Sequence, residues 1–424
     1  MADTGAKSKV VLAYSGGLDT SIILKWLQDE NYDVICFIAD VGQEEDLEAA
    51  RQKAIALGAT KVYVEDLKKD FVENFIFPAI KFNAIYESRY LLGTSLARPV
   101  IAAKQVEIAV KEGAEYVAHG ATGKGNDQVR FELSAYALVP GIKIIAPWRD
   151  PKFTSRFKGR TDLLNYGREK GIPLPSGERP PYSMDENLLH ISYESGELED
   201  PAHPANEAMF RRTLPIKEWA DEPEKIRIHF KNGTPISVEN GSHKVEGSVE
   251  LFTYLNSLGR KHGIGRIDIV ENRFVGIKSR GVSETPGSTI LRSAHLNIEG
   301  VRMDREGDAA SRTCSFPQFS PLLYTGFWFS QKRDFFVPPF GQKPRGEEGG
   351  GVVFPLAKGR GPFPSLPFFP PPPPHPPLWV SGGGGGLGLQ PPQPLWGGFL
   401  PPKLTFPLPP PPPKPPRGGR VGAP

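Results

Sequence analysis

The sequence of 424 residues lacks features that mark several classes of protein. Its two cysteines, Cys36 and Cys314, can form neither a framework of several disulfides nor a zinc site of paired cysteines. It contains no run of about 18 apolar residues, and its first ten residues include no long apolar stretch. We therefore expect a cytosolic protein without a membrane span, a secretory signal or a metal site made by a cluster of side chains.

The chain also has little excess charge outside its C-terminal end. Residues 341–424 contain eight Lys or Arg and two Glu, whereas residues 1–340 contain 43 basic and 46 acidic side chains. A nucleic-acid partner requires a broad cationic surface to neutralise phosphates. We therefore expect neither DNA nor RNA as a partner, and no interaction with a membrane.

Proline and glycine are scarce in the first 340 residues and abundant afterwards. They fill 44 of the 84 positions from 341 to 424, against 47 of the 340 positions before them. A segment of this composition cannot bury enough apolar surface to offset its chain entropy. We expect a disordered tail with polyproline II character.

Apolar runs alternate with helical patterns in the first 150 residues. The runs at 9–14, 33–40, 61–66, 115–120 and 142–147 each predict a strand. This alternation predicts an α/β fold with an open, parallel, five-stranded Rossmann-like sheet covered on both faces. Ligands of such sheets bind at the carboxyl ends of the strands, so the candidate site lies at the loops after Tyr14, Ala39 and His119.

The alternation stops after about residue 150, and a mixed pattern follows a proline-containing segment. This pattern predicts an α+β domain, with a hairpin turn at Asn232-Gly233. We therefore divide the chain into a nucleotide-binding domain at 8–175, a second domain at 176–335 and a low-complexity tail at 336–424.

The loop from Ser15 to Ser21 follows a predicted strand and opens a predicted helix. Gly16 and Gly17 permit positive φ angles and close approach of a ligand, and a helix N-terminus favours an anion by up to ~2 kcal/mol. The loop has no Walker A lysine. We interpret it as a phosphate cradle; the alternative is a simple turn with Asp19 as the N-cap.

A second glycine-rich loop runs from His119 to Arg130. If a helix begins near Asn126, then Asn126, Asp127 and Arg130 share one face of it. A carboxylate and a guanidinium together match the ammonium and carboxylate groups of an amino acid. An N-cap followed by a solvated helix face explains the same pattern equally well.

Three further segments mix polar and apolar side chains. By their own patterns, residues 89–98 and 182–192 favour a cap followed by a core helix, and residues 263–273 favour a half-buried strand. His119 and His190 are as compatible with a structural role as with catalysis.

Five segments, in this order, resemble the argininosuccinate synthase family: AYSGGLDTS, RYLLGTSLARP, HGATGKGNDQVRFE, SMDENLLHISYE and GRIDIVENRFVGIKSRG. The resemblance covers about residues 8–304, and the first segment is similar to the loop of the PP-loop (N-type) ATP pyrophosphatases. It implies an AMP-forming carbon-nitrogen ligase that uses ATP and magnesium. Such a ligase joins citrulline to aspartate through a citrulline adenylate, in arginine biosynthesis and the urea cycle.

The resemblance also implies which residues bind each substrate. For ATP it implies Ala13, Tyr14, Ser15, Gly16, Gly17, Leu18, Asp19, Thr20, Ser21, Ala39 and Gly120. For aspartate it implies Thr122, Asn126 and Asp127. For citrulline it implies Tyr90, Ser95, Asn126, Arg130, Ser183, Ser192, Glu271 and Ser283. Ser15 and Asp19 are expected to shape the pyrophosphate site during catalysis, and Asp127 is expected to accept a proton from the aspartate amine.

Two features depart from the family's pattern. Ser283 stands where the family has a tyrosine that contacts citrulline. After Glu306 we expect the resemblance to end, apart from residues 324–328, so that the closing strands and long C-terminal helix of the family are absent. That helix joins the subunits of the family's homotetramer, and we interpret the tail as aberrant coding sequence that impairs assembly.

Two alternatives stay open. The first is another PP-loop enzyme, such as a tRNA-modifying one, which the acidic front part and the lack of paired cysteines disfavour. The second is a catalytically impaired interaction protein whose segments 370–379 and 409–417, both rich in proline, bind SH3 or WW domains.

Overall fold

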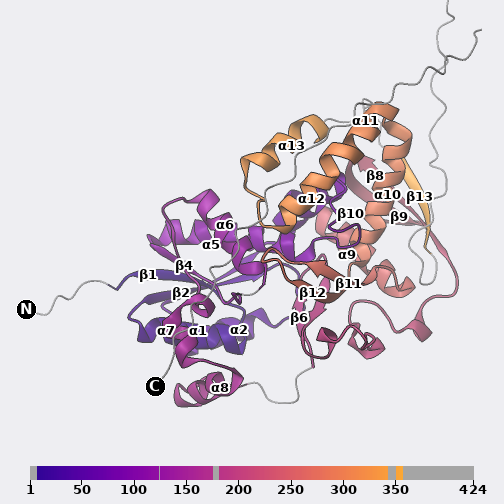
Figure 1. The fold of residues 1–424 in the computed structure, drawn as a ribbon. Helices are drawn as coiled ribbons and strands as arrows, with labels where there is room; N and C mark the ends of the chain where they lie inside the picture. The colour runs from indigo at the N-terminus through magenta and orange to yellow at the C-terminus, as the bar shows by residue number, and fades with distance from the viewer. Residues whose placement is uncertain (1–6, 124, 175–180, 342–349, 357–424) are drawn as a thin grey trace, which may run out of the picture. The chain divides into compact units, whose positions relative to one another are not determined.

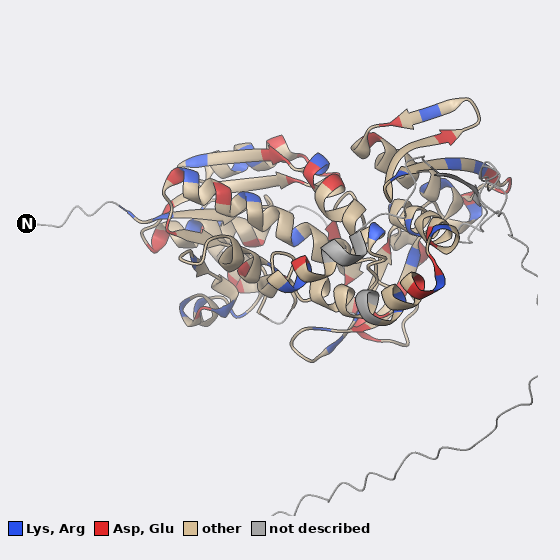
Figure 2. Ribbon diagram, turned by 90° about the horizontal axis from the view of Figure 1, so that it is seen from above, with Lys and Arg blue, Asp and Glu red and all other residues tan. Residues whose placement is uncertain are grey.

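A computed structural model describes residues 7–123, 125–174, 181–341 and 350–356 (Figure 1). Within them, no helix is long and apolar enough to cross a membrane. Basic and acidic residues are interspersed over the described elements (Figure 2). This mixture matches the nearly balanced charge of the first 340 residues.

The N-terminal part contains a five-stranded parallel sheet. Its strands are β1 (Lys9–Ala13), β2 (Asp33–Asp40), β3 (Lys61–Asp66), β4 (Tyr116–Ala118) and β5 (Lys143–Ile145). They lie in the order β3-β2-β1-β4-β5, with β1 parallel to both β2 and β4. The predicted open sheet is confirmed. The chain continues from β1 to one side and later returns to the other, so the loops after β1 and β4 flank a topological switch point, where such sheets bind ligands.

Helices cover both faces of this sheet. They are α1 (Leu18–Asp29), α2 (Leu47–Ala56), α3 (Lys68–Asp70), the π-helical turn Phe71–Ile76, α4 (Phe77–Lys81), α5 (Gly93–Glu112), α6 (Asp127–Leu138), the 3-10 turn Pro147–Arg149, α7 (Pro151–Arg156) and α8 (Arg160–Glu169). Successive side chains of a strand point to opposite faces. Val10 and Leu12 of β1 accordingly pack in one core cluster, and Val11 packs in another.

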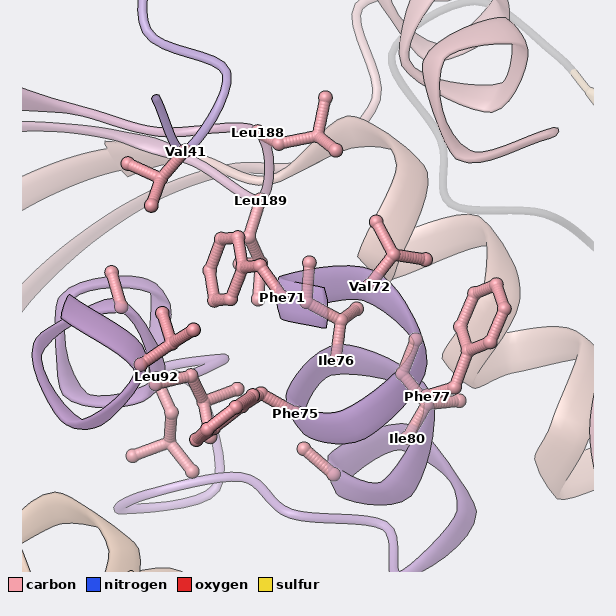
Figure 3. Close-up of a cluster of buried hydrophobic side chains, with 14 of the residues drawn as sticks. Val41, Phe71, Val72, Phe75, Ile76, Phe77, Ile80, Leu92, Leu188 and Leu189 are labelled. Carbon is pink, nitrogen blue, oxygen red and sulfur yellow. The ribbon is translucent and has the colours of Figure 1, made fainter. Parts of the chain in front are cut away.

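One of these core clusters joins the two domains. Phe71 and Phe75 pack among Val41, Leu92 and Leu188 (Figure 3). Leu188 belongs to the second domain, whereas the other four residues belong to the first. The walls of a site formed by both domains are therefore held by a shared apolar core.

The second domain contains two antiparallel sheets. One has the order β11-β12-β7-β6, made of β6 (Ser183–Glu186), β7 (Ile191–Glu194), β11 (Arg266–Asn272) and β12 (Lys278–Glu284). The other has the order β10-β9-β8-β13, made of β8 (Glu224–Lys231), β9 (Thr234–Asn240), β10 (His243–Glu246) and β13 (Gly350–Leu356). The 3-10 turns of the second domain are Gly196–Glu199, Glu207–Met209 and Ile216–Glu218. Its helices are α9 (Ser248–His262), α10 (Pro286–Arg302), α11 (Arg305–Ala310), the π-helical turn Ser311–Ser315, α12 (Phe316–Tyr324) and α13 (Gln331–Gly341).

The predicted hairpin at Asn232-Gly233 is confirmed. These two residues connect β8 and β9 and have φ angles of 56° and 77°. Positive φ at both central residues is the requirement of a type I′ turn.

The helix favoured by the pattern of residues 182–192 is wrong, because these residues form strands β6 and β7. The side chain of Asn187 explains the difference. Its Oδ1 accepts hydrogen bonds from the backbone nitrogens of Leu189, at 3.0 Å, and His190, at 3.2 Å. Such side-chain bonds to nearby backbone groups stabilise a turn in competition with a helix.

The expectation that no fold exists beyond about residue 340 is wrong for residues 350–356. They form β13, which pairs antiparallel with β8 and places Val352 opposite Ile228. Valine and phenylalanine favour strands even beside glycines, and an edge strand tolerates the proline at position 355. The remainder of the predicted tail, residues 342–349 and 357–424, lies outside the described part of the chain.

Candidate active site

The loop after β1 is held in a conformation that requires glycine. Gly16 has a φ angle of 76°, and a Cβ there would lie 2.7 Å from Cβ of Ala50 on α2. Lys53 of the same helix donates a hydrogen bond to the carbonyl oxygen of Gly16 at 2.9 Å. The N-cap of α1 is Gly17, so the interpretation of Asp19 as the N-cap is wrong. The glycines form the rigid strand-to-helix turn that a phosphate cradle needs.

The hydroxyl groups of this loop divide into two kinds. Ser21 Oγ is fully buried and donates to the carbonyl oxygen of Gly17 at 2.7 Å. Ser15 and Thr20 instead line a cavity, with their hydroxyl oxygens 3.2 Å apart. Thr20 Oγ1 also donates to the carbonyl oxygen of Gly17 at 3.4 Å, and Ser15 Oγ accepts from the backbone nitrogen of Gly17 at 3.4 Å. All three hydroxyl groups therefore stabilise the turn, and those of Ser15 and Thr20 also lie at the cavity.

A cavity of about 550 Å³ lies at the switch point. It brings together most of the ATP residues implied by the sequence and all of those implied for aspartate: Ala13, Tyr14, Ser15, Asp19, Thr20, Ala39, Gly120, Thr122, Asn126 and Asp127. It is also lined by Tyr90, Arg130, Ser183, Ser192, Glu271 and Ser283 from the citrulline set. The expected residues that are not among the lining are Gly16, Gly17, Leu18, Ser21 and Ser95.

Two arginines hold Asp127 at the cavity wall. Nε of Arg98 lies 3.0 Å from Oδ2 of Asp127, and Nη1 of Arg130 lies 2.9 Å from Oδ1. Burial by itself would raise the pKa of Asp127, but the two guanidinium charges outweigh burial and lower it. Asp127 is therefore a fixed anion in this structure.

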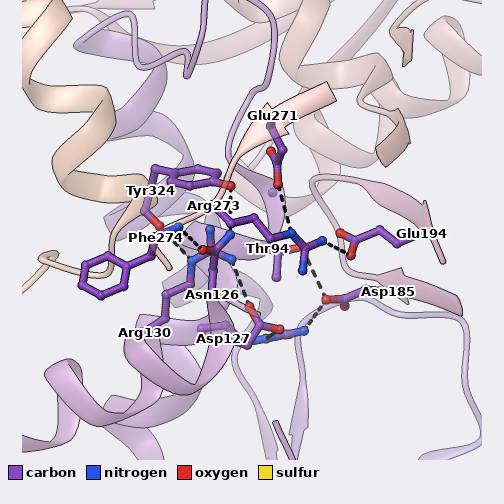
Figure 4. A network of polar contacts seen from close by, with 12 residues as sticks. Thr94, Asn126, Asp127, Arg130, Asp185, Glu194, Glu271, Arg273, Phe274 and Tyr324 are labelled. Atoms are coloured by element: carbon purple, nitrogen blue, oxygen red, sulfur yellow. Dashed lines mark hydrogen bonds and ion pairs between the residues drawn. The ribbon is translucent and has the colours of Figure 1, made fainter. Parts of the chain in front are cut away.

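Arg98 also contacts a second carboxylate, Asp185 of β6 (Figure 4). Burial raises the pKa of Asp185, and the negative charges of Asp127 and Glu194 raise it further against the opposing charge of Arg98. Two carboxyl groups that share one arginine thus have pKa values shifted in opposite directions. Such a separation is typical of sites that move protons.

Asn126 connects the glycine-rich loop to the second domain. Its Nδ2 donates to the hydroxyl oxygen of Tyr324 at 2.8 Å, and its Oδ1 accepts from the backbone nitrogen of Phe274 at 2.8 Å (Figure 4). The Tyr324 carbonyl accepts a hydrogen bond from Nε of Arg130 at 3.0 Å. Tyr324, at the end of α12, therefore fixes two of the residues that line the cavity.

The opposite wall consists of strands β7, β11 and β12. Ser283 pairs with Ser192 across two of these strands, and both side chains line the cavity. Burial raises the pKa of Glu271 on β11. Arg273 forms an ion pair with Glu194, and its Nε lies 4.0 Å from Oε1 of Glu271. Hydroxyl, carboxylate and guanidinium groups thus face the cavity from this side.

Sequence reasoning missed several polar residues of the cavity wall: Gln43, Glu45, Thr94, Arg98, Asp185, Glu194 and Arg273. Thr94, Arg98, Asp185, Glu194 and Arg273 lie within the motifs quoted above. The sequence does not show which of these side chains contact one another. Arg98 and Asp185 are 87 positions apart in the chain. Only the packing of α5 against β6 brings them together.

His190 stabilises the wall from behind. It is fully buried, and its Nε2 lies 3.0 Å from Oγ1 of Thr94. Burial lowers the pKa of His190 to about 3, so its ring is neutral at ordinary pH. Ser95, the next residue of α5, is also buried, and its Oγ has no hydrogen-bond partner among the described residues.

The comparisons with known proteins agree with this geometry. The model of the arginosuccinate synthase N-terminal HUP domain matches residues 9–173, and that of the C-terminal domain of the same family matches residues 182–351. An argininosuccinate synthase of Thermotoga maritima is 56% identical over 356 residues, which cover 83% of this chain and 86% of the relative. The human argininosuccinate synthase is 57% identical over 332 residues, which cover 78% of this chain and 80% of the relative.

These matches correct one expectation. The resemblance was expected to end at Glu306 apart from residues 324–328, but the C-terminal family model matches as far as residue 351. The sequence between these points forms helices α11 to α13 and leads into β13. The family's sequence pattern therefore extends through these helices.

We predict that the neutral state of His190 makes the protein less stable as pH falls. The pKa of His190 is about 3 in the folded state and 6.5 in the unfolded state. Below pH 6.5 the unfolded chain therefore binds a proton that the folded protein does not, which costs about 2 kcal/mol at pH 5. Urea unfolding at about pH 7 and 5 measures this loss.

His190→Gln, which does not titrate, should lose about 2 kcal/mol less stability than the wild type between these pH values. His203→Gln is the matched control, because His203 is half exposed and lies outside the cavity. An equal loss in the wild type and His190→Gln would contradict the prediction.

Proposed function

Because the chain belongs to the argininosuccinate synthase family, we propose that it forms argininosuccinate from citrulline and aspartate in the cavity at the switch point. The family is one of AMP-forming carbon-nitrogen ligases of arginine biosynthesis, and ATP is a substrate. The observation that carries the proposal is that one cavity is lined by the phosphate-type loop and by the Arg98–Asp127–Arg130 cluster. An ATP-dependent ligation of two amino acids requires both.

ATP is proposed to bind at the loops after β1, β2 and β4. Ser15, Asp19 and Thr20 would face its phosphates, and Ala39 and Gly120 would line the same side of the cavity. The remaining members of the ATP set, Gly16, Gly17, Leu18 and Ser21, do not line the cavity and would shape the loop. The N-terminus of α1 adds favourable electrostatic interaction with the phosphate charge.

Magnesium is proposed to be bound chiefly by the phosphates of ATP. Among the described residues, no group of three or more histidine, cysteine or acidic side chains could hold a metal ion. Magnesium commonly keeps several waters and uses one or two carboxylates with substrate phosphates, so it does not need such a group. Asp19, beside the phosphate loop, is the carboxylate that would contribute.

The two amino acids are proposed to bind on either side of Asn126. Thr122, Asn126 and Asp127 would hold aspartate, with Asp127 facing its ammonium group. Citrulline would contact Asn126 and the members of its set that line the cavity: Tyr90, Arg130, Ser183, Ser192, Glu271 and Ser283. Ser95 would support this wall from its buried position on α5.

The chemistry requires activation of a weak electrophile. The ureido oxygen of citrulline attacks the α-phosphorus of ATP, and pyrophosphate leaves. The aspartate amine then attacks the ureido carbon, and AMP leaves. Catalysis arises from positioning the three substrates and from stabilising their charges, because no side chain needs to form a covalent bond.

For assembly and location, we propose a cytosolic protein that associates less completely than a homotetramer. Pro and Gly dominate residues 357–424 and oppose formation of a long helix there. Val301, Phe327 and Phe335, on or beside α10 to α13, are 49%, 40% and 71% exposed. Unburied apolar side chains of this kind mark a surface for association or aggregation.

We predict that the purified chain releases pyrophosphate from ATP over many turnovers only when citrulline, aspartate and magnesium are all present. A pyrophosphate assay with each component omitted in turn measures this, and light scattering on the same sample gives its mass in solution. Release without citrulline would contradict the proposed reaction. A mass of four chains would contradict the proposed incomplete assembly.

We predict that Ser283 weakens citrulline binding. A hydrogen bond to a charged group contributes about 1.5 to 3 kcal/mol, or roughly ten- to a hundredfold in affinity. Ser283→Tyr, which restores the family's residue at the cavity wall, should therefore lower the KM for citrulline by roughly that factor and leave the KM for ATP unchanged. Ser279→Tyr, on the same strand and outside the cavity lining, is the control. An unchanged KM for citrulline in Ser283→Tyr would refute the prediction.

The tail is proposed to bind SH3 or WW domains in addition to the enzyme's reaction. Segments 370–379 and 409–417 contain uninterrupted prolines of the kind that such domains recognise. We predict that the full chain is retained by immobilised SH3 or WW domains and that replacing the prolines of both segments by alanine abolishes retention. Equal retention of the two chains would contradict this proposal.

A further inference from the structure

Two carboxylates, Asp127 and Asp185, share the guanidinium group of Arg98 at the cavity wall. Arg98 contacts Oδ2 of Asp127 through Nε, at 3.0 Å, and Oδ2 of Asp185 through Nη2. Asp127 comes from α6 and Asp185 from β6, and both line the cavity. Their contacts differ, and this difference decides which of them can take up a proton.

Asp127 has both oxygens in ion pairs. Oδ2 accepts from Arg98, and Oδ1 accepts from Nη1 of Arg130 at 2.9 Å. A proton on either oxygen would remove the negative charge that assists both hydrogen bonds, and a charge-assisted hydrogen bond is about twice as strong as a neutral one. Asp127 is suited to hold an ammonium group by its charge and is poorly suited to accept the proton.

Asp185 has one oxygen left for a ligand. Its hydrogen bonds, from Arg98 and from Oγ1 of Thr94 at 3.4 Å, both reach Oδ2. Oδ1 accepts no hydrogen bond from any residue within the described ranges. The side chain is 28% exposed and lines the cavity. A proton can therefore be added to Oδ1 without breaking either contact.

The charges around Asp185 favour this protonation. Arg98 on α5 opposes it, whereas Asp127 on α6, Glu194 on β7 and Glu45 in the loop after β2 carry like charges. The further cations of this wall are already paired, Arg130 with Asp127 and Arg273 with Glu194. Burial and the like charges raise the pKa of Asp185 towards the working pH, where a general base is most effective.

We infer that Asp185, and not Asp127, accepts the proton that the aspartate ammonium group must lose before it attacks the adenylate. The inference rests on the proposed function. With this proton on Asp185, the amine's lone pair forms a bond to the carbon of the protonated ureido group. The bond from this carbon to the AMP oxygen then breaks, and AMP leaves with that electron pair. The AMP phosphate takes the second proton from the new nitrogen, so the product keeps one positive guanidinium charge.

Asp185→Asn tests the assignment, because its amide oxygen can still accept from Arg98 while the group cannot take up a proton. Pyrophosphate formed on the enzyme from ATP and citrulline, without aspartate, is measured by acid quench in a single turnover. Argininosuccinate formation after addition of aspartate is measured separately. We expect the first step to stay within about threefold of the wild type and the second to slow by about 10²- to 10⁴-fold.

The pH dependence provides a second readout. In the wild type, the rate of the aspartate step should fall as pH drops through the pKa of Asp185, because the base becomes protonated. This dependence should vanish in Asp185→Asn and persist in Asp185→Glu, which keeps a carboxylate. Asp127→Asn is the matched comparison, since it shares Arg98, and it should mainly raise the KM for aspartate.

Each contrary result overturns the inference. A similar loss of both steps in Asp185→Asn and Asp185→Glu would show a structural role. Loss of the aspartate step in Asp127→Asn with an unchanged KM for aspartate would assign the proton to Asp127. Absence of citrulline-dependent pyrophosphate in the wild type would refute the proposed function itself and remove the basis of the inference.

Discussion

The ion pairs of Arg98 are the interaction on which the cavity depends. The side chain of Arg98 is 17% exposed, so its charge is largely removed from water, and it is compensated by Asp127 from α6 and Asp185 from β6. A buried charge left without any partner typically costs about 3 to 5 kcal/mol, and with two partners Arg98 stays compensated when one of them is lost. The same contacts set the relative position of the two domains at the cavity and the different protonation behaviour of the two acids. Structural and chemical roles therefore coincide in one guanidinium group.

The second constraint comes from a part of the chain that carries no substrate-type motif. Tyr324 accepts a hydrogen bond from Asn126, its ring lies 5.0 Å from the guanidinium of Arg130, and it stacks on Tyr86 with ring centroids 3.7 Å apart. Asn126 and Arg130 thus gain their orientation from helix α12, about 200 positions later in the chain. A site on a glycine-rich loop needs such support, because the loop itself has few packing contacts to fix it.

The sequence was sufficient to predict the parallel sheet, the positions of its strands and the hairpin at Asn232-Gly233, and most of the site residues that it indicated line the cavity. These features depend on local patterns, such as apolar runs, turn residues and recognisable motifs. The strands at residues 183–194 were missed because the decisive bonds of Asn187 are specific to one turn and do not appear in hydrophobic periodicity. The Arg98–Asp185 pair was missed because long-range pairing carries no local signal. The two ion pairs of Asp127 could likewise not be read from the sequence, because Arg98 comes from another helix.

The elements that form and support the cavity precede the C-terminal segment of unusual composition. Every described residue that lines the cavity precedes α10, and the supporting contacts of Tyr324 come from α12. Strand β13 completes the other sheet of the second domain by pairing with β8. The unusual composition of residues 357–424 therefore begins after the elements that form and support the cavity. An altered C-terminal end would change which surfaces meet another molecule, while the charges and hydrogen bonds that prepare the substrates stay within one chain.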